Sequence, residues 1–221
     1  EMTAEKIIID VGARTNLPEI TGREATGYIC SETLFGDKYP KQPYKSLIIV
    51  GGGPIGCEFS HIFAAAGTKV TVVQHNNRLL SKADEDISEQ IRQNMEAFGI
   101  KTYLNANLLE AKKADDQKIL LFEDRETGER IEVTGEEIMY ATGIKPVSKE
   151  LKIENTAIET DERGWIKTNE FLETSVNGIW AIGDINGQPA FRHKANYEAD
   201  ILAHNLFGGN EPGKWRWARY D

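Results

Sequence analysis

The chain has 221 residues, of which 40% are hydrophobic and 28% charged, enough to bury one substantial core or two modest ones. A formal net charge of -9 argues against nucleic acid or an anionic membrane as the main partner, because neither would meet a basic surface. No apolar run approaches the roughly 20 residues that span a bilayer, and the amino terminus lacks a leader pattern. We therefore expect a cytoplasmic protein that binds a small molecule.

The first part of the chain predicts alternating strands and helices. A short strand in KIIIDVG precedes a loop, and SLIIVGGGP is a continuous apolar strand of the kind expected in a parallel sheet that is covered on both faces and flanked by helices. Further strands are expected in KVTVVQ and GIKTYL. A helix over 54–66 is expected to bury Ile55, Phe59, Ile62, Phe63 and Ala66. A second helix over 84–98 is expected to bury Ile87, Ile91, Met95 and Phe98.

The pattern changes after residue 105. Three short alternating segments between 105 and 137 predict an antiparallel meander, and EIMYATGIKP predicts a strand that runs into a glycine turn. A strand in GIWAIGD, a helix over about 189–206 and the polar aromatic tail KWRWARYD follow. The fold class is therefore α/β, with a Rossmann-like parallel sheet plus an antiparallel meander.

A glycine turn in VGGGPIGCEFS lies between a predicted strand and a predicted helix. Gly51, Gly53 and Gly56 satisfy GxGxxG within a strand-helix-strand unit. Gly51 allows a tight turn, Gly53 lets the backbone approach a pyrophosphate, and Gly56 allows close packing of helix on strand. Pro54 suits the first helical turn, whose free amides attract phosphate. The context predicts a dinucleotide site.

The end of the next strand bears on the choice of nucleotide. NAD sites usually carry an acid here, which binds the adenosine ribose and repels a 2'-phosphate. Gln74 occupies that position and is followed by His75, and no arginine follows the strand directly, although Arg78 is close. Neither NAD nor NADP is cleanly specified, and we prefer NAD slightly.

The two cysteines, Cys30 and Cys57, match no disulfide framework, zinc site or CxxC or CxxxxC redox pair. We predict two reduced, structural thiols and no metal site. No arrangement of side chains beside the glycine turn is recognisable as a proton donor, so an ordinary dehydrogenase acting on a soluble substrate is disfavoured and no catalytic residue is assigned.

Three ordered motifs, GGGPIGCEF, ATGIKP and GIWAIGDINGQPAFRHKANYEA, resemble the FAD-dependent pyridine nucleotide-disulfide oxidoreductases, and HKA favours their dihydrolipoamide dehydrogenase group. The resemblance implies that FAD is present in the intact enzyme. It implies a pyrophosphate cradle made of Gly51, Gly53, Pro54, Ile55 and Gly56. It places Glu58 near the nicotinamide. Gln74 and His75 would face the adenosine ribose, and Gly143 would line the same cleft. The resemblance assigns to FAD the residues Gly183, Asp184, Ala190, Phe191, Arg192 and His193.

Such an enzyme begins with a second GxGxxG and a CxxxxC disulfide and ends with an interface domain carrying a histidine-glutamate pair. The resemblance therefore implies a middle segment: residues 1–44 as a strand and loop from an FAD-type domain, 45–147 as the NAD(P)-binding domain, and 148–221 as the returning FAD-type portion. We expect the segment to be inactive and monomeric and the intact enzyme to be a homodimer. The alternative is a free-standing, non-catalytic nucleotide-binding module.

Overall fold

The computed structural model describes residues 3–208 and 212–214, so most of the expected aromatic tail, residues 215–221, lies outside the described part. The chain forms two compact units. The central unit comprises residues 15–143, and the split unit comprises residues 1–14 together with 144–221. Residues 15–44, which the resemblance grouped with an FAD-type domain, thus belong to the compact central unit. Where the chain passes from one unit to the other, a two-stranded sheet is formed by β2 (Ala13–Thr15) and β11 (Ile144–Pro146).

A five-stranded parallel sheet forms the middle of the central unit, in the order β3-β10-β4-β5-β6. Its strands are β3 (Ile29–Cys30), β10 (Glu137–Tyr140), β4 (Ser46–Val50), β5 (Lys69–Val73) and β6 (Lys101–Tyr103). Strands β4 and β5 align Val50 with Val73, so both end at the same edge of the sheet. The expected strands are confirmed, except that the one expected in EIMYATGIKP is divided between β10 and β11.

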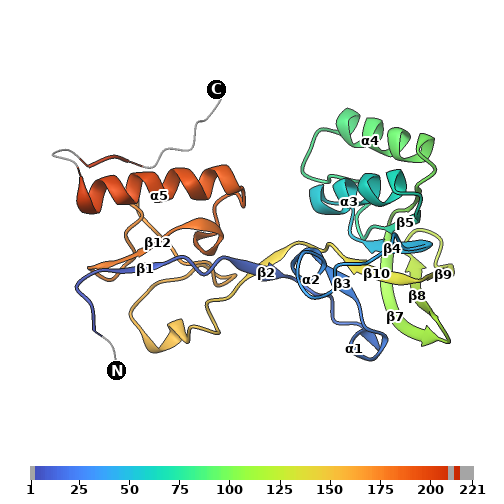
Figure 1. The fold of residues 1–221 in the computed structure, drawn as a ribbon, viewed down its shortest axis with the longest axis horizontal. Coiled ribbons are helices and arrows are strands. Elements are labelled where there is room, and N and C mark those ends of the chain that lie inside the picture. Colours follow the sequence, from blue (N-terminus) through green and yellow to red (C-terminus); the bar gives the residue numbers. More distant parts are fainter. Residues whose placement is uncertain (1–2, 209–211, 215–221) are drawn as a thin grey trace. The chain divides into compact units, whose positions relative to one another are not determined.

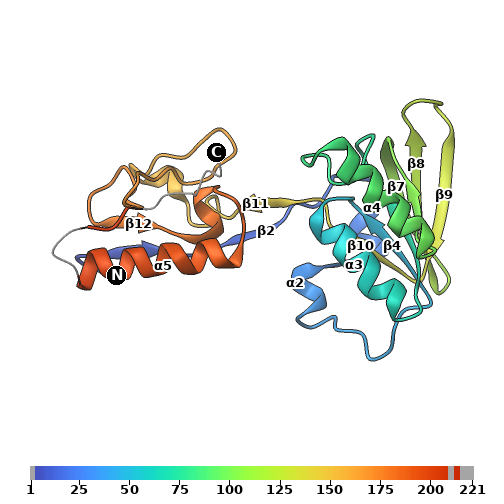
Figure 2. The same cartoon turned by 90° about the horizontal axis from the view of Figure 1, so that it is seen from above.

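The two faces of this sheet are covered differently. Leu47 and Ile49 of β4 point into the core shared with the helices, whereas Ile48 and Val50 point into the core shared with the meander. Figures 1 and 2 show the helices on one side of the sheet and the meander on the other. The helices are α3 (Pro54–Ala65) and α4 (Glu85–Ala97), and the meander is β7 (Ala106–Ala114), β8 (Gln117–Asp124) and β9 (Arg130–Gly135). The expected cover on both faces is confirmed, but the helices supply it on one face and the antiparallel meander on the other.

The buried sides of both helices match those expected only in part. In α3 Phe59 and Phe63 are buried as expected, and so are Gly56, Cys57 and Ser60. Ile62 is two positions from Ser60, hence about 200° around the helix, and is 58% exposed. The last expected residue of α3, Ala66, is also exposed. In α4 Met95 is buried and Ile91 packs against the same core, as expected, whereas Ile87 and Phe98 are exposed.

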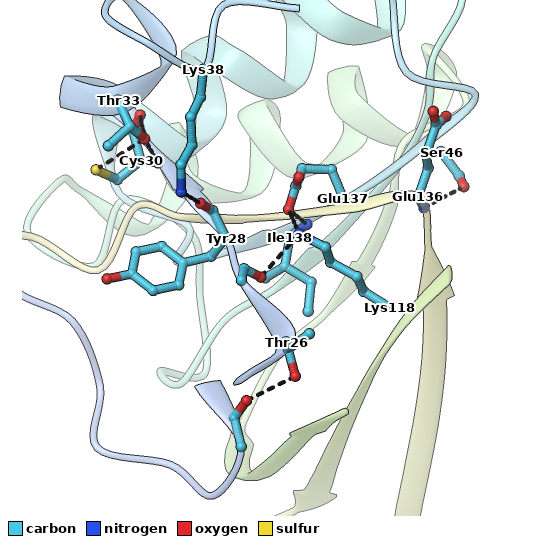
Figure 3. A network of polar contacts seen from close by, with 12 residues as sticks. Thr26, Tyr28, Cys30, Thr33, Lys38, Ser46, Lys118, Glu136, Glu137 and Ile138 are labelled. Carbon is cyan, nitrogen blue, oxygen red and sulfur yellow. Dashed lines mark hydrogen bonds and ion pairs between the residues drawn. The ribbon is translucent and has the colours of Figure 1, made fainter. Parts of the chain in front are cut away.

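A polar network ties the meander to the edge of the sheet (Figure 3). Lys118 of β8 forms an ion pair with Glu137 at the start of β10 and donates to the carbonyl oxygen of Gly27 at 3.0 Å. Gly27 ends α1 (Arg23–Thr26), and the short helix α2 (Ser31–Leu34) follows β3. Lys118 thus joins three segments that are far apart in the sequence.

The split unit is built on a two-stranded parallel sheet of β1 (Ile7–Ile9) and β12 (Ile179–Ala181). Two 3-10 turns and one helix complete it: η1 (Ile153–Asn155), η2 (Gly183–Asn186) and α5 (Arg192–Phe207). Helix α5 packs Ile201 and Leu202 against Ile182, directly after β12. It begins three residues later than expected, after Phe191 in an extended conformation.

Within residues 3–208 and 212–214, none of the helices has the length and apolar character needed to cross a bilayer. The same residues bring together no group of three histidine, cysteine or acidic side chains suited to a metal ion.

Candidate functional site

The glycine turn connects β4 to α3 in a backbone that leaves little choice of residue. Gly51 has a φ of 109°, and a Cβ there would overlap the carbonyl oxygen of Ala141. A Cβ on Gly56 would overlap the carbonyl oxygen of Gly51, so the helix packs directly on the turn. At Gly53, by contrast, a Cβ would meet no atom within 4 Å. Gly53 therefore leaves free space in front of the backbone, where a ligand can approach.

Gln74 follows β5 and fastens this turn from the side. Its Oε1 accepts a hydrogen bond of 2.8 Å from the amide of Gly52, and its Nε2 donates to the carbonyl oxygen of Arg78 at 3.1 Å. The side chain is only 6% exposed. The amide of Gln74 therefore stabilises the protein's own loop, a contact that the sequence did not reveal.

A pocket of about 340 Å³ lies over the carboxyl ends of β4 and β5, in the usual position for a ligand of an open parallel sheet. It brings together five of the residues expected to contact the nicotinamide nucleotide: Gly51, Gly53, Gln74, His75 and Gly143. Sequence reasoning missed the other lining residues, namely Val50, Val73, Asn76, Ser81, Lys82, Leu108, Ala141 and Thr142. Most of these follow β5 or β10, so the ends of those strands were the available signal.

His75 is exposed at this pocket and is held by two neighbours. Its Nδ1 lies 3.2 Å from the carbonyl oxygen of Ala106, and its Nε2 lies 3.3 Å from Nη1 of Arg125. Arg125 belongs to the turn between β8 and β9, fifty residues further along the chain. Nothing in the sequence indicates this approach.

The remaining residues expected around the nicotinamide nucleotide lie on α3. Pro54 is the exposed first residue of the helix, and its missing amide costs no hydrogen bond there. Ile55 is half-buried and packs against the helix-side core. Glu58 is exposed one turn further along.

The residues expected to contact FAD lie in the split unit. Gly183 begins η2 with a φ of 73°, and a Cβ there would come within 2.7 Å of Oδ1 of Asp10. Asp184 is the next residue and is half-buried. Ala190, Phe191, Arg192 and His193 lead into α5 and are all exposed.

A buried ion pair holds η2 against α5. Nζ of Lys194 lies 2.9 Å from Oε2 of Glu198, and both side chains are at most 1% exposed. The lysine also donates to the carbonyl oxygen of Gly183 and to Oδ1 of Asn186, while the carboxylate accepts from the amide of Gly183 and from Nδ2 of Asn186. The separation of four residues on a predicted helix was a visible signal for this pair.

Both cysteines are free and buried, as predicted. Sγ of Cys57 lies 3.6 Å from the carbonyl oxygen of Gly52, beneath the glycine turn. Burial raises the pKa of the Cys57 thiol from 9.0 to about 11, with a smaller contribution from the charge of Glu58. The thiol is therefore protonated and unreactive at neutral pH.

Residues 1–199 match the family described as pyridine nucleotide-disulphide oxidoreductase. The chain belongs to this family. A dihydrolipoyl dehydrogenase of Acholeplasma laidlawii is 36% identical over 210 residues, which cover 93% of this chain and 59% of that protein. A mercuric reductase of Bacillus cereus is 31% identical over 209 residues, 95% of this chain and 32% of that protein.

Among solved structures, the Cu(II) complex of the HOCl-induced flavoprotein disulfide reductase RclA from Escherichia coli matches with a TM-score of 0.82 and 31% identity. The match covers 92% of this chain and 44% of that chain. The resemblance seen in the three motifs is thus confirmed, as is the α/β fold. The pyridine nucleotide-disulphide oxidoreductases are FAD-dependent enzymes that use a nicotinamide nucleotide. Our chain spans 32% and 59% of the length of the two curated relatives.

Proposed function

We propose that the central unit binds a nicotinamide nucleotide with its pyrophosphate at the glycine turn. The observation that carries this proposal is the contrast within the turn: Gly51 and Gly56 are fixed by close contacts, whereas the space in front of Gly53 is free. A turn with only a structural role would need Gly51 and Gly56 but would gain nothing from a glycine at position 53. Free space beside Gly53 is what a backbone approaching a phosphate requires.

The electrostatics of the turn suit an anion. The first intrahelical bond of α3 runs from the amide of Cys57 to the carbonyl oxygen of Gly53, which leaves the amides of Ile55 and Gly56 in the first turn without helical acceptors. These amides and the helix dipole favour negative charge at this end. None of the residues that line the pocket carries a carboxylate. A pyrophosphate would thus meet hydrogen-bond donors and no negative charge that repels it.

In the intact enzyme, we propose, the nucleotide exchanges hydride with FAD, and a disulfide is the further electron carrier, as in dihydrolipoamide dehydrogenases. Bound FAD would supply the redox chemistry, while this chain would orient the nicotinamide and exclude water. Glu58 is proposed to lie near the nicotinamide. The split unit is proposed to contribute Gly183, Asp184 and residues 190–193 to FAD. The exposure of residues 190–193, which lead into α5, supports this part of the proposal.

The division of roles makes a prediction about the segment on its own. Because the expected disulfide and acid-base residues are not among its side chains, we propose that it binds nucleotide without turning it over. We further propose that the segment is monomeric and the intact enzyme a homodimer.

The substitution Gly53→Ala tests the nucleotide site without disturbing the fold. Gly53 has a φ of -78° and free space at its Cβ position, so alanine fits without strain. The methyl group would nevertheless stand where the pyrophosphate approaches. We expect the melting temperature to be unchanged and the affinity for NADH and NADPH, measured by fluorescence titration, to fall about tenfold or more, which corresponds to roughly 1.4 kcal/mol.

Ala66→Ser serves as the matched control, since Ala66 is an exposed residue at the other end of α3. It should leave both the melting temperature and the affinities unchanged. Unaltered nucleotide binding by folded Gly53→Ala protein would overturn the proposed placement of the pyrophosphate.

A further inference from the structure

The pocket beside the glycine turn is basic where an NAD site is usually acidic. Its lining contains His75 and Lys82 but neither aspartate nor glutamate. Gln74, at the position of the usual ribose-binding acid, is neutral and has both amide atoms engaged within the protein. The pocket thus has no charge that would repel a phosphate on the adenosine ribose.

Arg125 adds a second cation next to His75, one of the residues that line this pocket. An arginine offers no acceptor, so its contact with Nε2 of His75 requires that this nitrogen accept and that Nδ1 carry the ring proton, facing the carbonyl oxygen of Ala106. Nη1 of Arg125 also lies 3.4 Å from the carbonyl oxygen of His75. The histidine therefore holds one end of the guanidinium beside the pocket.

The rest of the guanidinium remains available. Within residues 3–208 and 212–214, the Nε and Nη2 atoms of Arg125 donate to no protein acceptor, and the side chain is exposed. A planar fork of donors is the arrangement that binds phosphate oxygens best. Arg125 thus combines a fixed position with unused donors suited to an anion.

Two acids flank Arg125 but are engaged in the turn. Oδ1 of Asp124 accepts from the amides of Glu126 and Thr127, and Oε1 of Glu126 accepts from Nδ2 of Asn105. Neither carboxylate forms an ion pair with Arg125. Arg78, the basic residue closest in sequence to the strand end, is instead paired with Glu85 at 3.1 Å. Of these two arginines, Arg125 is the one that is not paired with a carboxylate.

We propose that the pocket takes a 2'-phosphorylated nicotinamide nucleotide, and that Arg125, held in place by His75, binds the phosphate. This inference rests on the proposed nucleotide site. The slight preference for NAD drawn from the sequence depended on the lack of an arginine directly after β5. The turn between β8 and β9 brings an arginine to that place from elsewhere in the chain.

The full chain can be titrated with NADPH and with NADH, following nucleotide fluorescence. We expect the wild-type protein to bind NADPH about tenfold more tightly than NADH. Arg125→Ala should lower the affinity for NADPH about tenfold and change that for NADH by less than about twofold. Arg125→Lys should retain part of the preference, because it keeps the charge and loses the fork.

Arg130→Ala is the matched control, since Arg130 is exposed on the same hairpin and the substitution removes the same charge. Its affinities for both nucleotides should equal those of the wild type. An equal loss of NADPH affinity in Arg130→Ala and Arg125→Ala would overturn a specific contact. Tighter binding of NADH by the wild type, or an unchanged preference in Arg125→Ala, would overturn the inference while leaving the nucleotide site intact. No binding of either nucleotide would overturn both.

Discussion

The carbonyl oxygen of Gly51 lies where the side chain of any larger residue at position 56 would begin. The two glycines therefore act together. Gly51 turns the chain with a φ of 109°, and Gly56 lets α3 descend onto that turn. Their contact sets the height of the helix amino terminus above the sheet, and with it the position of the amides proposed to face phosphate.

We predict that Gly56→Ala destabilises the central unit by about 1–3 kcal/mol, because the methyl group would force α3 away from the sheet. Thermal or urea unfolding followed by circular dichroism measures the loss. Gly53→Ala is the control, since it adds the same methyl group three residues earlier into free space. Equal losses of stability in the two variants would contradict the close packing of Gly56 on Gly51.

The local sequence predicted those parts of the molecule that local physics determines. The short apolar run that ends at Gly51 favours a buried strand, and the glycine spacing determines the turn that follows. The exposure of Ile62 was not predictable in this way, because an apolar residue on either side of α3 fits a helical period. Only the contact at Gly56 decides which side faces the sheet.

The chemistry of the pocket was less accessible to sequence reasoning for the same physical reason. Gln74 was found at the right position, but its hydrogen bonds to Gly52 and Arg78 depend on the direction of a side chain. Arg125 reaches His75 because the meander covers one face of the sheet, a packing that no neighbouring residues encode. Long-range contacts of this kind require the assembled fold.

The buried pair in the split unit provides a prediction about stability. Lys194→Met should destabilise this unit by about 3–5 kcal/mol, because it leaves the carboxylate of Glu198 buried without its cation. The described tryptophans, Trp165 and Trp180, both lie in the split unit, so urea unfolding followed by tryptophan fluorescence reports on it. The unit should unfold at a lower urea concentration in the variant.

Lys167→Met is the control for that experiment. Lys167 lies 3.8 Å from Glu159 in the same unit, but both side chains are more than half exposed. Exposed pairs contribute about 0–1 kcal/mol, so this variant should unfold close to the wild type. Comparable shifts in the two lysine variants would show that burial does not strengthen the Lys194–Glu198 pair.

The raised pKa of the Cys57 thiol predicts a loss of stability at alkaline pH. Its folded-state pKa is about 11 against 9.0 in the unfolded chain, so between these values the folded protein binds the additional proton. The contribution is present below pH 9 and is lost as the pH rises toward 11. Burial likewise raises the pKa of Tyr140 to about 12, which extends the decline above pH 10.

Urea unfolding at pH 8, 9, 10 and 11 measures this decline, and Cys57→Ala should make it shallower between pH 9 and 11. Cys30→Ala removes the other buried thiol and serves as the control. A pH dependence that Cys57→Ala leaves unchanged would show that this thiol does not carry the effect.

Gln74→Glu tests the position of the adenosine ribose. The carboxylate keeps the bond from the amide of Gly52 but can no longer donate to the carbonyl oxygen of Arg78, which costs about 1 kcal/mol of stability. Its charge would repel a 2'-phosphate, so the ratio of affinities should shift toward NADH. Competition titration with the two nucleotides measures this ratio. Gln93→Glu adds the same charge on the exposed side of α4 and should leave the ratio unchanged. The same ratio before and after Gln74→Glu would mean that the ribose binds elsewhere.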